Sequence, residues 1–242
     1  MKISQGALKE FYNPDYCQIK WNEIYRKGFR TEPTDAMVNG LVFEQNVIGS
    51  TRGGEIYEIP KLKNGKDSKR EIDLNNLIVF AKQTIKRLKI KFLEIQPEWE
   101  VDDLIGHPDA LIEWKGNKAI MDLKFTGTKE DDSCRWNPYA WGGDFEYKDF
   151  SQALHYVEMY YLRTGEYLPF FYLIFGKSGW VKFLSVDITS VAIENHKDKI
   201  KAFREDLKNF NPQPSTNYLE CIKCPIQCSK RLKKPNCITI TI

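Results

Sequence analysis

Two aspartates and a lysine gather around one predicted β-hairpin, and their types suit phosphate chemistry. Asp122 and Lys124 are two positions apart in an apolar segment, so both side chains point to the same face of a strand. Asp109 follows Pro108, which has no N–H for a central ladder, so Asp109 lies near a strand start. Two carboxylates can hold Mg²⁺, with the amine facing a water or a phosphate. The same groups also suit an ion pair lining a partly solvated sheet face.

The elements that must position these groups are two strands within residues 105–125, joined by a tight turn at 115–118. Met121, Leu123 and Phe125 alternate with the polar pair and therefore face the other side of the sheet. The sequence thus predicts a central hairpin with one polar and one apolar face.

A third carboxylate is available from a helix predicted over residues 35–48. Glu44 lies four residues after Gly40, and a glycine one turn below a carboxylate lets another backbone or a substrate strand approach that face. Glu44 is therefore a candidate ligand, although a solvated glutamate also fits the pattern.

A long loop and a helix follow the hairpin. The loop over residues 126–147 contains Arg135 and Trp136, a cation and a flat ring of the kind on which unpaired bases stack, but packing of its aromatic residues is an equal alternative. The helix predicted over residues 150–162 puts Gln152 and Tyr156 on one face, four residues apart.

Six cysteines are distributed unevenly. Cys17 and Cys134 stand alone, and four crowd the C-terminal tail. These four are Cys221, Cys224, Cys228 and Cys237. Such crowding predicts a metal site and not a disulfide scaffold. A tetrahedral Zn²⁺ site could use the four tail thiols, and a [4Fe–4S] cluster could use Cys17 with three of them.

The remaining pattern predicts further helices and strands. Listed in chain order, these are two short N-terminal helices with Ser4 as the first cap, a loop over residues 50–68, a helix capped by Asp73 or Asn75, an extended strand over residues 92–101, a second hairpin over residues 168–186, and a helix capped by Thr189 or Ser190 and continuing to Phe210. Strands and helices in this order favour an α/β fold.

Composition bounds the protein class. The 242 residues are enough for one large core, and a formal charge of +3 means that a nucleic-acid surface must arise from local clustering. No segment approaches about 18 consecutive apolar residues, and the N-terminus lacks an apolar signal segment. We therefore expect no membrane association and no signal peptide, and a cytoplasmic protein of a bacterial, phage-infected or archaeal cell.

Several motifs in this order resemble the PD-(D/E)xK nuclease superfamily, in particular its RecB-like and CRISPR-associated RecB-like exonucleases with a C-terminal cysteine cluster. The resemblance covers nearly the whole chain and rests on Cys17, Gly40 with Glu44, Pro108-Asp109, Asp122-Leu123-Lys124, Gln152 with Tyr156, and the tail cysteines. It implies an α/β restriction-endonuclease-like core, with a mixed central sheet flanked by helices and a cysteine-rich metal clasp. One domain would span residues 1–242, with N-terminal helices to 30, a catalytic core to 210 and a tail from 211.

The resemblance also implies an activity. Glu44, Asp109, Asp122 and the carbonyl of Leu123 would hold one or two Mg²⁺ or Mn²⁺ ions, and Lys124 would position or deprotonate the attacking water. The protein would cut phosphodiester bonds as a deoxyribonuclease, with single-stranded DNA or duplex ends as the favoured substrate. Recombination, repair and phage or defence DNA processing are the expected settings. The open alternatives are an end-trimming nuclease of CRISPR adaptation and a non-catalytic, metal-stapled DNA-binding or assembly module.

Other residues take roles only through this resemblance. Gln152 would help orient the active site, and Tyr156 would face the DNA. Cys17 would join the C-x2-C pair of Cys221 and Cys224 around an iron–sulfur cluster. The third tail spacing departs from the usual C-x2-C-x5-C, so Cys237 is favoured as the fourth ligand, Cys228 remains the alternative, and zinc stays open. A helicase, recombinase or integrase is the expected partner, because the sequence has no helicase motif of its own.

Overall fold

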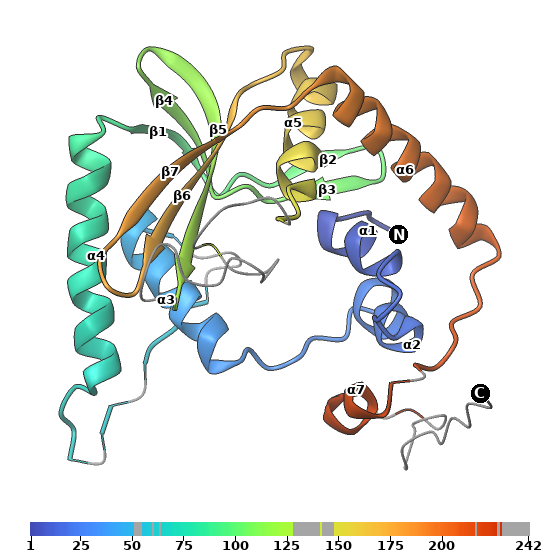
Figure 1. Ribbon diagram of the computed structural model, residues 1–242, viewed down its shortest axis with the longest axis horizontal. Helices are drawn as coiled ribbons and strands as arrows, with labels where there is room; N and C mark the ends of the chain where they lie inside the picture. Colours follow the sequence, from blue (N-terminus) through green and yellow to red (C-terminus); the bar gives the residue numbers. More distant parts are fainter. Residues whose placement is uncertain are drawn as a thin grey trace, which may run out of the picture. The chain divides into compact units, whose positions relative to one another are not determined.

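The computed structural model describes residues 1–50, 55–59, 61–62, 64–127, 141, 148–215, 217–226 and 228 (Figure 1). The chain divides into two compact units. The larger comprises Pro33–Ile193, and the smaller combines Met1–Glu32 with Glu194–Ile242. The predicted division into N-terminal helices, catalytic core and tail stays a prediction.

A five-stranded mixed sheet forms the centre of the larger unit, in the order β1-β4-β5-β6-β7. The bounds are β1 (Lys91–Ile95), β4 (Ala110–Trp114), β5 (Asn117–Thr126), β6 (Phe170–Gly176) and β7 (Val181–Val186). Strands β5 and β6 run parallel, and the other neighbouring pairs run antiparallel. A separate two-stranded sheet pairs β2 (Trp99–Val101) with β3 (Leu104–Gly106). The predicted α/β fold with a mixed sheet is confirmed.

The central hairpin joins β4 to β5 through a two-residue turn. Lys115 and Gly116 have φ angles of 50° and 80°, and Trp114 pairs with Asn117 across the turn. Two successive positive φ angles are typical of a type I′ turn, whose twist matches that of the flanking strands. The predicted hairpin is therefore confirmed.

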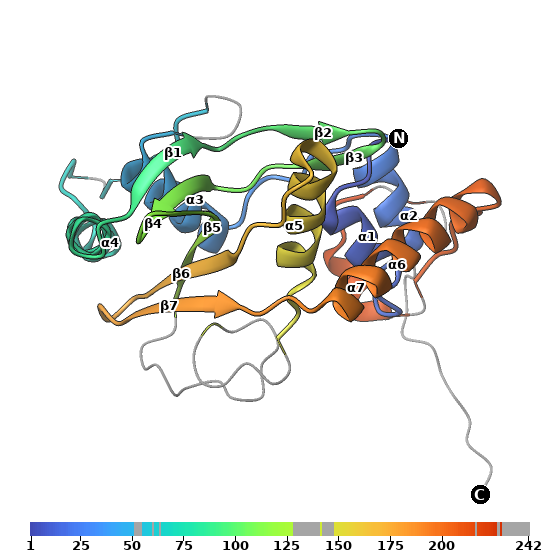
Figure 2. The ribbon, with the colours of Figure 1, turned by 90° about the horizontal axis from the view of Figure 1, so that it is seen from above.

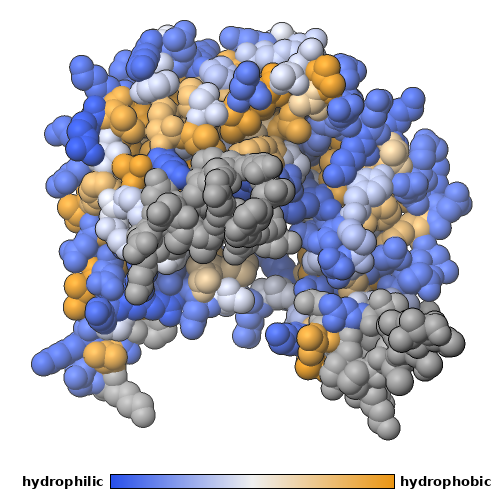
Figure 3. Space-filling model, viewed as in Figure 1, coloured by the Kyte–Doolittle hydropathy of each residue, from blue (hydrophilic) through white to orange (hydrophobic). Residues whose placement is uncertain are grey.

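Helices cover both faces of this sheet (Figure 2). Helices α3 (Asp35–Ile48) and α4 (Lys69–Arg87) pack on the face that carries Met121 and Leu123. Helix α5 (Ser151–Thr164) lies on the opposite side and is the crossover between the parallel strands β5 and β6. Helices on both faces are the expected cover for a sheet with a parallel pair. On the face drawn in Figure 3, apolar side chains gather where Figure 1 draws β4 and β5.

Two predicted boundaries were wrong. The extended strand over residues 92–101 breaks into β1 and β2, because Gln96 has a φ of 47° and Pro97 follows it. The interruption predicted at Pro108 is present, because residues 107–109 separate β3 from β4, which begins at Ala110. Helix α4 begins at Lys69 and not near residue 75. Ser68 caps it by accepting a hydrogen bond from the Glu71 N–H at 3.1 Å.

The smaller unit contains α1 (Gln5–Phe11), α2 (Gln18–Trp21), the π-helical turn η1 (Asn22–Arg26), the part of α6 (Ser190–Lys208) from residue 194 onward, and α7 (Tyr218–Lys223). Ser4 caps α1 as predicted, by accepting a hydrogen bond from Ala7 N–H. The core of this unit is aromatic: the ring of Phe11 lies 5.0 Å from that of Trp21 and 4.8 Å from that of Phe203. Within the described part of the chain, no helix is both long enough and apolar enough to cross a membrane.

Candidate active site

The site forms where β4 stops and β5 continues. The β4–β5 ladder ends with Ala110 opposite Met121, so β5 has no β4 partner beyond that point. The Asp109 carboxylate takes the vacant place, and its Oδ2 accepts a hydrogen bond from the Leu123 N–H at 2.7 Å. In a strand, the N–H and C=O of one residue point to the same side, so the Leu123 carbonyl also points toward this opening. Pro108, which cannot donate, marks the break.

Asp122 and Lys124 form an ion pair on the α5 side of β5. The Asp122 residue is 0% exposed, whereas 24% of the Lys124 side chain remains exposed. Burial alone would lower the pKa of Lys124, but the negative charges of Asp122 and Asp109 outweigh burial and raise that pKa above its usual value. Lys124 is therefore a cation at neutral pH.

Helix α5 and strand β6 supply the wall next to this pair. Tyr156 donates a hydrogen bond from its hydroxyl to the His107 carbonyl at 3.1 Å, and Gln152 lies 3.4 Å from the same hydroxyl. Tyr172 is opposite Asp122 in the β5–β6 register, and its hydroxyl lies 3.5 Å from the Gln152 side-chain oxygen. Burial raises the pKa of Tyr172, and the charge of Asp122 raises it further. Both predicted residues of α5 thus lie beside the strand opening.

One residue of the long loop reaches the same place. The Trp141 ring lies 4.7 Å from the Tyr172 ring, and the Lys124 ammonium is 5.9 Å from the Trp141 ring centroid. Lys148 lies over the same indole at 3.7 Å. The two predicted DNA-binding residues of this loop, Arg135 and Trp136, lie outside the described residues.

Glu44 approaches from the opposite side of the sheet, on α3. Its Oε1 accepts a hydrogen bond from Gln96 Nε2 at 2.5 Å, and the Gln96 backbone N–H donates to the Asp109 carbonyl at 2.8 Å. Gln96 therefore joins the Glu44 side chain to the Asp109 backbone. The structure brings Asp109, Asp122 and Lys124 together directly, and it connects Glu44 to them through one intervening residue.

The donor set fits a hard divalent cation. Asp109 and Asp122 are both buried carboxylates at the strand opening, the Leu123 carbonyl adds a neutral oxygen, and Glu44 adds a third acid nearby. Within the described ranges, no three His, Cys, Asp or Glu side chains converge into a metal-ligand group. Mg²⁺ usually takes one or two carboxylates and keeps several waters, so two converging aspartates suffice for it.

The cysteine cluster is described only in part, and Cys134 and Cys237 lie outside the described residues. Cys17, Cys221, Cys224 and Cys228 lie in the smaller unit and form no disulfide with one another. Tyr16 lies near both ends of that set: burial raises its pKa most, and electrostatic interactions with Tyr25, Glu10, Cys224 and Cys17 raise it further. The Gln213 N–H donates to the Gln18 side chain at 2.9 Å. The segments that carry the N-terminal and tail cysteines therefore approach each other.

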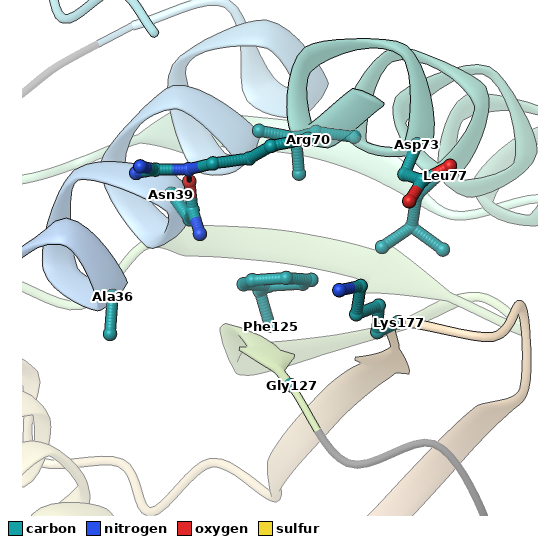
Figure 4. A pocket seen from close by; sticks show the side chains of 9 residues that line it. Ala36, Asn39, Arg70, Asp73, Leu77, Phe125, Gly127 and Lys177 are labelled. Carbon is teal, nitrogen blue, oxygen red and sulfur yellow. Dashed lines mark hydrogen bonds between the residues drawn. The ribbon is translucent and has the colours of Figure 1, made fainter. Parts of the chain in front are cut away.

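A pocket lies on the other face of the sheet from Lys124. It has a volume of about 250 Å³ and is lined by α3, α4, the end of β5 and Lys177. In Figure 4, Phe125 and Lys177 face Arg70 and Asn39 across the pocket. Arg70 is already engaged, since its Nε donates to Asn39 at 2.6 Å and its Nη1 pairs with Asp35 at 3.2 Å. This pocket is separate from the strand opening, because neither Asp109, Asp122, Lys124 nor Glu44 lines it.

Comparisons with known proteins place the fold. No protein-family model matches the sequence, and no curated protein matches it. A solved structure from Eubacterium rectale, of a protein named "Putative exonuclease", aligns with 98% of this chain and 91% of its own length, at 20% identity and a TM-score of 0.66. Another solved structure aligns with 96% of this chain and 87% of its own length, at 10% identity and a TM-score of 0.36. A score this low does not indicate a shared fold. The chain therefore shares the fold of the first protein.

Two residues at the site were not predicted from the sequence. Tyr172 lies within an apolar strand, where nothing distinguishes it from a core residue. Gln96 carries a weak signal, because it is a polar residue before a proline in the middle of an apparently continuous strand. Such a position indicates a break, but it does not say where the side chain points.

Proposed function

We propose that this chain is a metal-dependent nuclease that hydrolyses phosphodiester bonds in DNA. The observation that carries the proposal is the pair of buried carboxylates, Asp109 and Asp122, beside the cationic Lys124 at the opening between β4 and β5. The fold shared with a protein named as an exonuclease supports it. Combining this fold with an acidic, lysine-containing strand opening favours metal-assisted hydrolysis over a structural ion pair.

Each residue takes a role that its position allows. Asp109, Asp122 and the Leu123 carbonyl would hold Mg²⁺ or Mn²⁺. Glu44 would be a further ligand, reaching the ion from α3. A bound ion of this kind lowers the pKa of its water and neutralises charge on the phosphate oxygens. Asp109 remains fixed for this purpose, because the Leu123 N–H holds one of its oxygens at 2.7 Å.

Lys124 acts as a donor in this proposal. Its amine pairs with the Asp122 carboxylate, and in that ion pair it is an ammonium, which has no lone pair with which to accept a proton. The ammonium instead orients the attacking water or the scissile phosphate and balances negative charge there. Positioning is thus favoured over the alternative that Lys124 deprotonates the water.

Single-stranded DNA or DNA ends are the proposed substrate. Trp141 is partly exposed and presents an aromatic ring whose centroid lies 5.9 Å from the Lys124 ammonium, and its ring packs on that of the buried Tyr172 at 4.7 Å. Unpaired bases stack on such rings, whereas bases in a duplex are already stacked on each other. A helicase or recombinase that supplies unpaired ends is the matching partner.

The cysteines are proposed to form a metal clasp in the smaller unit. Cys17 with Cys221, Cys224 and either Cys237 or Cys228 would hold a [4Fe–4S] cluster, and a Zn²⁺ site is the alternative. The shared proximity of Cys17 and Cys224 to Tyr16 supports a site that includes the N-terminal cysteine. Anaerobic purification separates the two metals, because a brown preparation contains iron–sulfur and a colourless one with stoichiometric zinc does not.

The catalytic proposal is tested with labelled single-stranded and duplex DNA, with and without Mg²⁺. Asp122→Asn removes one negative charge and keeps the shape of the side chain, and Lys124→Met removes the ammonium. The matched control is Asp187→Asn, which is the same Asp-to-Asn substitution at an exposed position. We expect each site variant to lose cleavage by about a hundredfold or more while the control cleaves normally. Cleavage that survives both site variants contradicts the proposal. Wild-type protein that binds DNA without Mg²⁺-dependent cutting is instead a non-catalytic binding module.

A further inference from the structure

Gln96 has a backbone conformation that its residue type disfavours. Its φ of 47° lies in the left-handed region, which glycine adopts without cost and other residues adopt with strain. Pro97 follows it, and the proline ring further restricts the preceding residue. A connection from β1 to β2 alone would be served better by glycine at this position. The strained glutamine therefore needs a reason beyond the turn.

The contacts of Gln96 supply a reason. Its backbone N–H donates to the Asp109 carbonyl at 2.8 Å, and its side-chain Nε2 donates to Glu44 Oε1 at 2.5 Å. A carboxylate only accepts hydrogen bonds, so the amide NH₂ must face Glu44. One residue therefore holds two segments that carry acidic groups of the proposed metal site.

The orientation of the Gln96 side-chain amide is a second feature that is unfavourable for folding. With the NH₂ directed to Glu44, the side-chain oxygen of Gln96 is buried, and no described residue donates a hydrogen bond to it. A buried acceptor without a donor is unfavourable. The unmet acceptor follows from directing the amide at Glu44, and the strained φ belongs to the same residue. The contact to Glu44 is therefore made by a residue that is unfavourable in both its backbone and its side chain.

We propose that Gln96 is a positioning residue that holds the Glu44 carboxylate beside Asp109 in the geometry that a divalent cation needs. A glutamate side chain has three rotatable bonds, and fixing it before the ion arrives removes ordering cost from the binding step. The hydrogen bond is charge-assisted, which makes it strong enough to select one rotamer. This inference rests on the proposed function, because it assigns Glu44 to the metal site.

The decisive variant is Gln96→Gly, because it separates positioning from folding. Glycine relieves the left-handed strain and removes the side-chain contact, so unfolding should need the same or more denaturant while Mn²⁺ binds about tenfold more weakly. Mn²⁺ affinity is measured without DNA, by the loss of the free-ion electron paramagnetic resonance signal. Lys89→Gly is the matched control. Lys89 has a φ of 56° and an exposed side chain at the end of α4, so the change relieves similar strain and leaves Mn²⁺ affinity unchanged.

A double-mutant cycle with Glu44→Gln tests whether Gln96 affects Mn²⁺ affinity through Glu44. If Gln96 acts through Glu44, then adding Gln96→Gly to Glu44→Gln weakens Mn²⁺ binding no further. Gln96→Asn, which keeps an amide but is one methylene too short to reach Glu44, should weaken Mn²⁺ binding as glycine does. Equal Mn²⁺ affinity in wild type and Gln96→Gly overturns the positioning role, as does a Gln96→Gly variant that unfolds in markedly less denaturant. Wild-type protein that binds no Mn²⁺ overturns the proposed metal site as well, so the two failures are distinguishable.

Discussion

His155 makes the fold sensitive to acid. It lies on α5, is 0% exposed, and has its Nε2 3.2 Å from the Ile105 carbonyl. Burial lowers the pKa of His155 from 6.5 to about 4, and the hydrogen bond to the Ile105 carbonyl offsets this only in part. The imidazole is therefore neutral in the folded protein throughout the neutral range.

The sign of the effect follows from proton uptake. The unfolded chain protonates His155 near pH 6.5, whereas the folded chain resists protonation until about pH 4. Its contribution to the free energy of unfolding is complete above pH 6.5 and is lost as the pH falls from 6.5 to 4. At 1.36 kcal/mol for each pH unit, the loss amounts to about 3 kcal/mol.

The test compares wild type with His155→Gln by urea unfolding between pH 4 and pH 8. Glutamine can place a donor near the position of Nε2 but cannot titrate, so the variant should be less stable at pH 8 and lose about 3 kcal/mol less than wild type on acidification. Nuclear magnetic resonance gives a direct check, because the chain has three histidines and the ring of His155 should not titrate above about pH 5. Parallel stability curves for the two proteins would refute the reasoning.

Three further changes test other parts of the structure. Gly106→Ala should destabilise the protein by about 1–3 kcal/mol in urea unfolding, because the added Cβ would lie 2.8 Å from Met159 Sδ and 3.0 Å from the Tyr156 ring; an unchanged midpoint contradicts this packing. Trp141→Ala should weaken single-stranded DNA binding, measured in EDTA at fixed salt, by about 1–3 kcal/mol, and should leave duplex binding nearly unchanged. Cys17→Ser should abolish bound iron in the purified protein; full zinc content in that variant shows that the tail binds metal without Cys17.

The sheet and the central hairpin were predictable because their signals are local. Alternating polar and apolar side chains indicate strand β5, and Lys115-Gly116 fits the type I′ turn that joins it to β4. The start of α4 was also encoded locally, since Ser68 and Glu71 have the spacing of a capping box. The predicted start is wrong because Asp73 and Asn75, which also have cap-forming side chains, lie inside the helix, whereas Ser68 is the cap.

The completed site was less predictable because it depends on long-range contacts. Asp109 takes a ladder position only because β4 ends at Ala110, and a sequence pattern does not specify where a pairing stops to within one residue. Tyr172 joins the site through the parallel register with β5, which is set by the α5 crossover. Gln96 joins it through a side-chain contact to a residue 52 positions away. Each of these depends on three-dimensional arrangement and not on local residue type.

The energetics of the strand opening argue that its charges serve a ligand. Asp109 and Asp122 are 2% and 0% exposed, and transferring an ion into a protein interior costs several kcal/mol for each ion. The hydrogen bond from the Leu123 N–H to Asp109 and the ion pair of Asp122 with Lys124 are among the contacts that offset part of that cost. Apolar residues at these two positions would avoid the cost, as Met121 does on the opposite face of β5. With Glu44 included, three carboxylates and one ammonium leave a formal charge of −2, and a divalent cation would neutralise it.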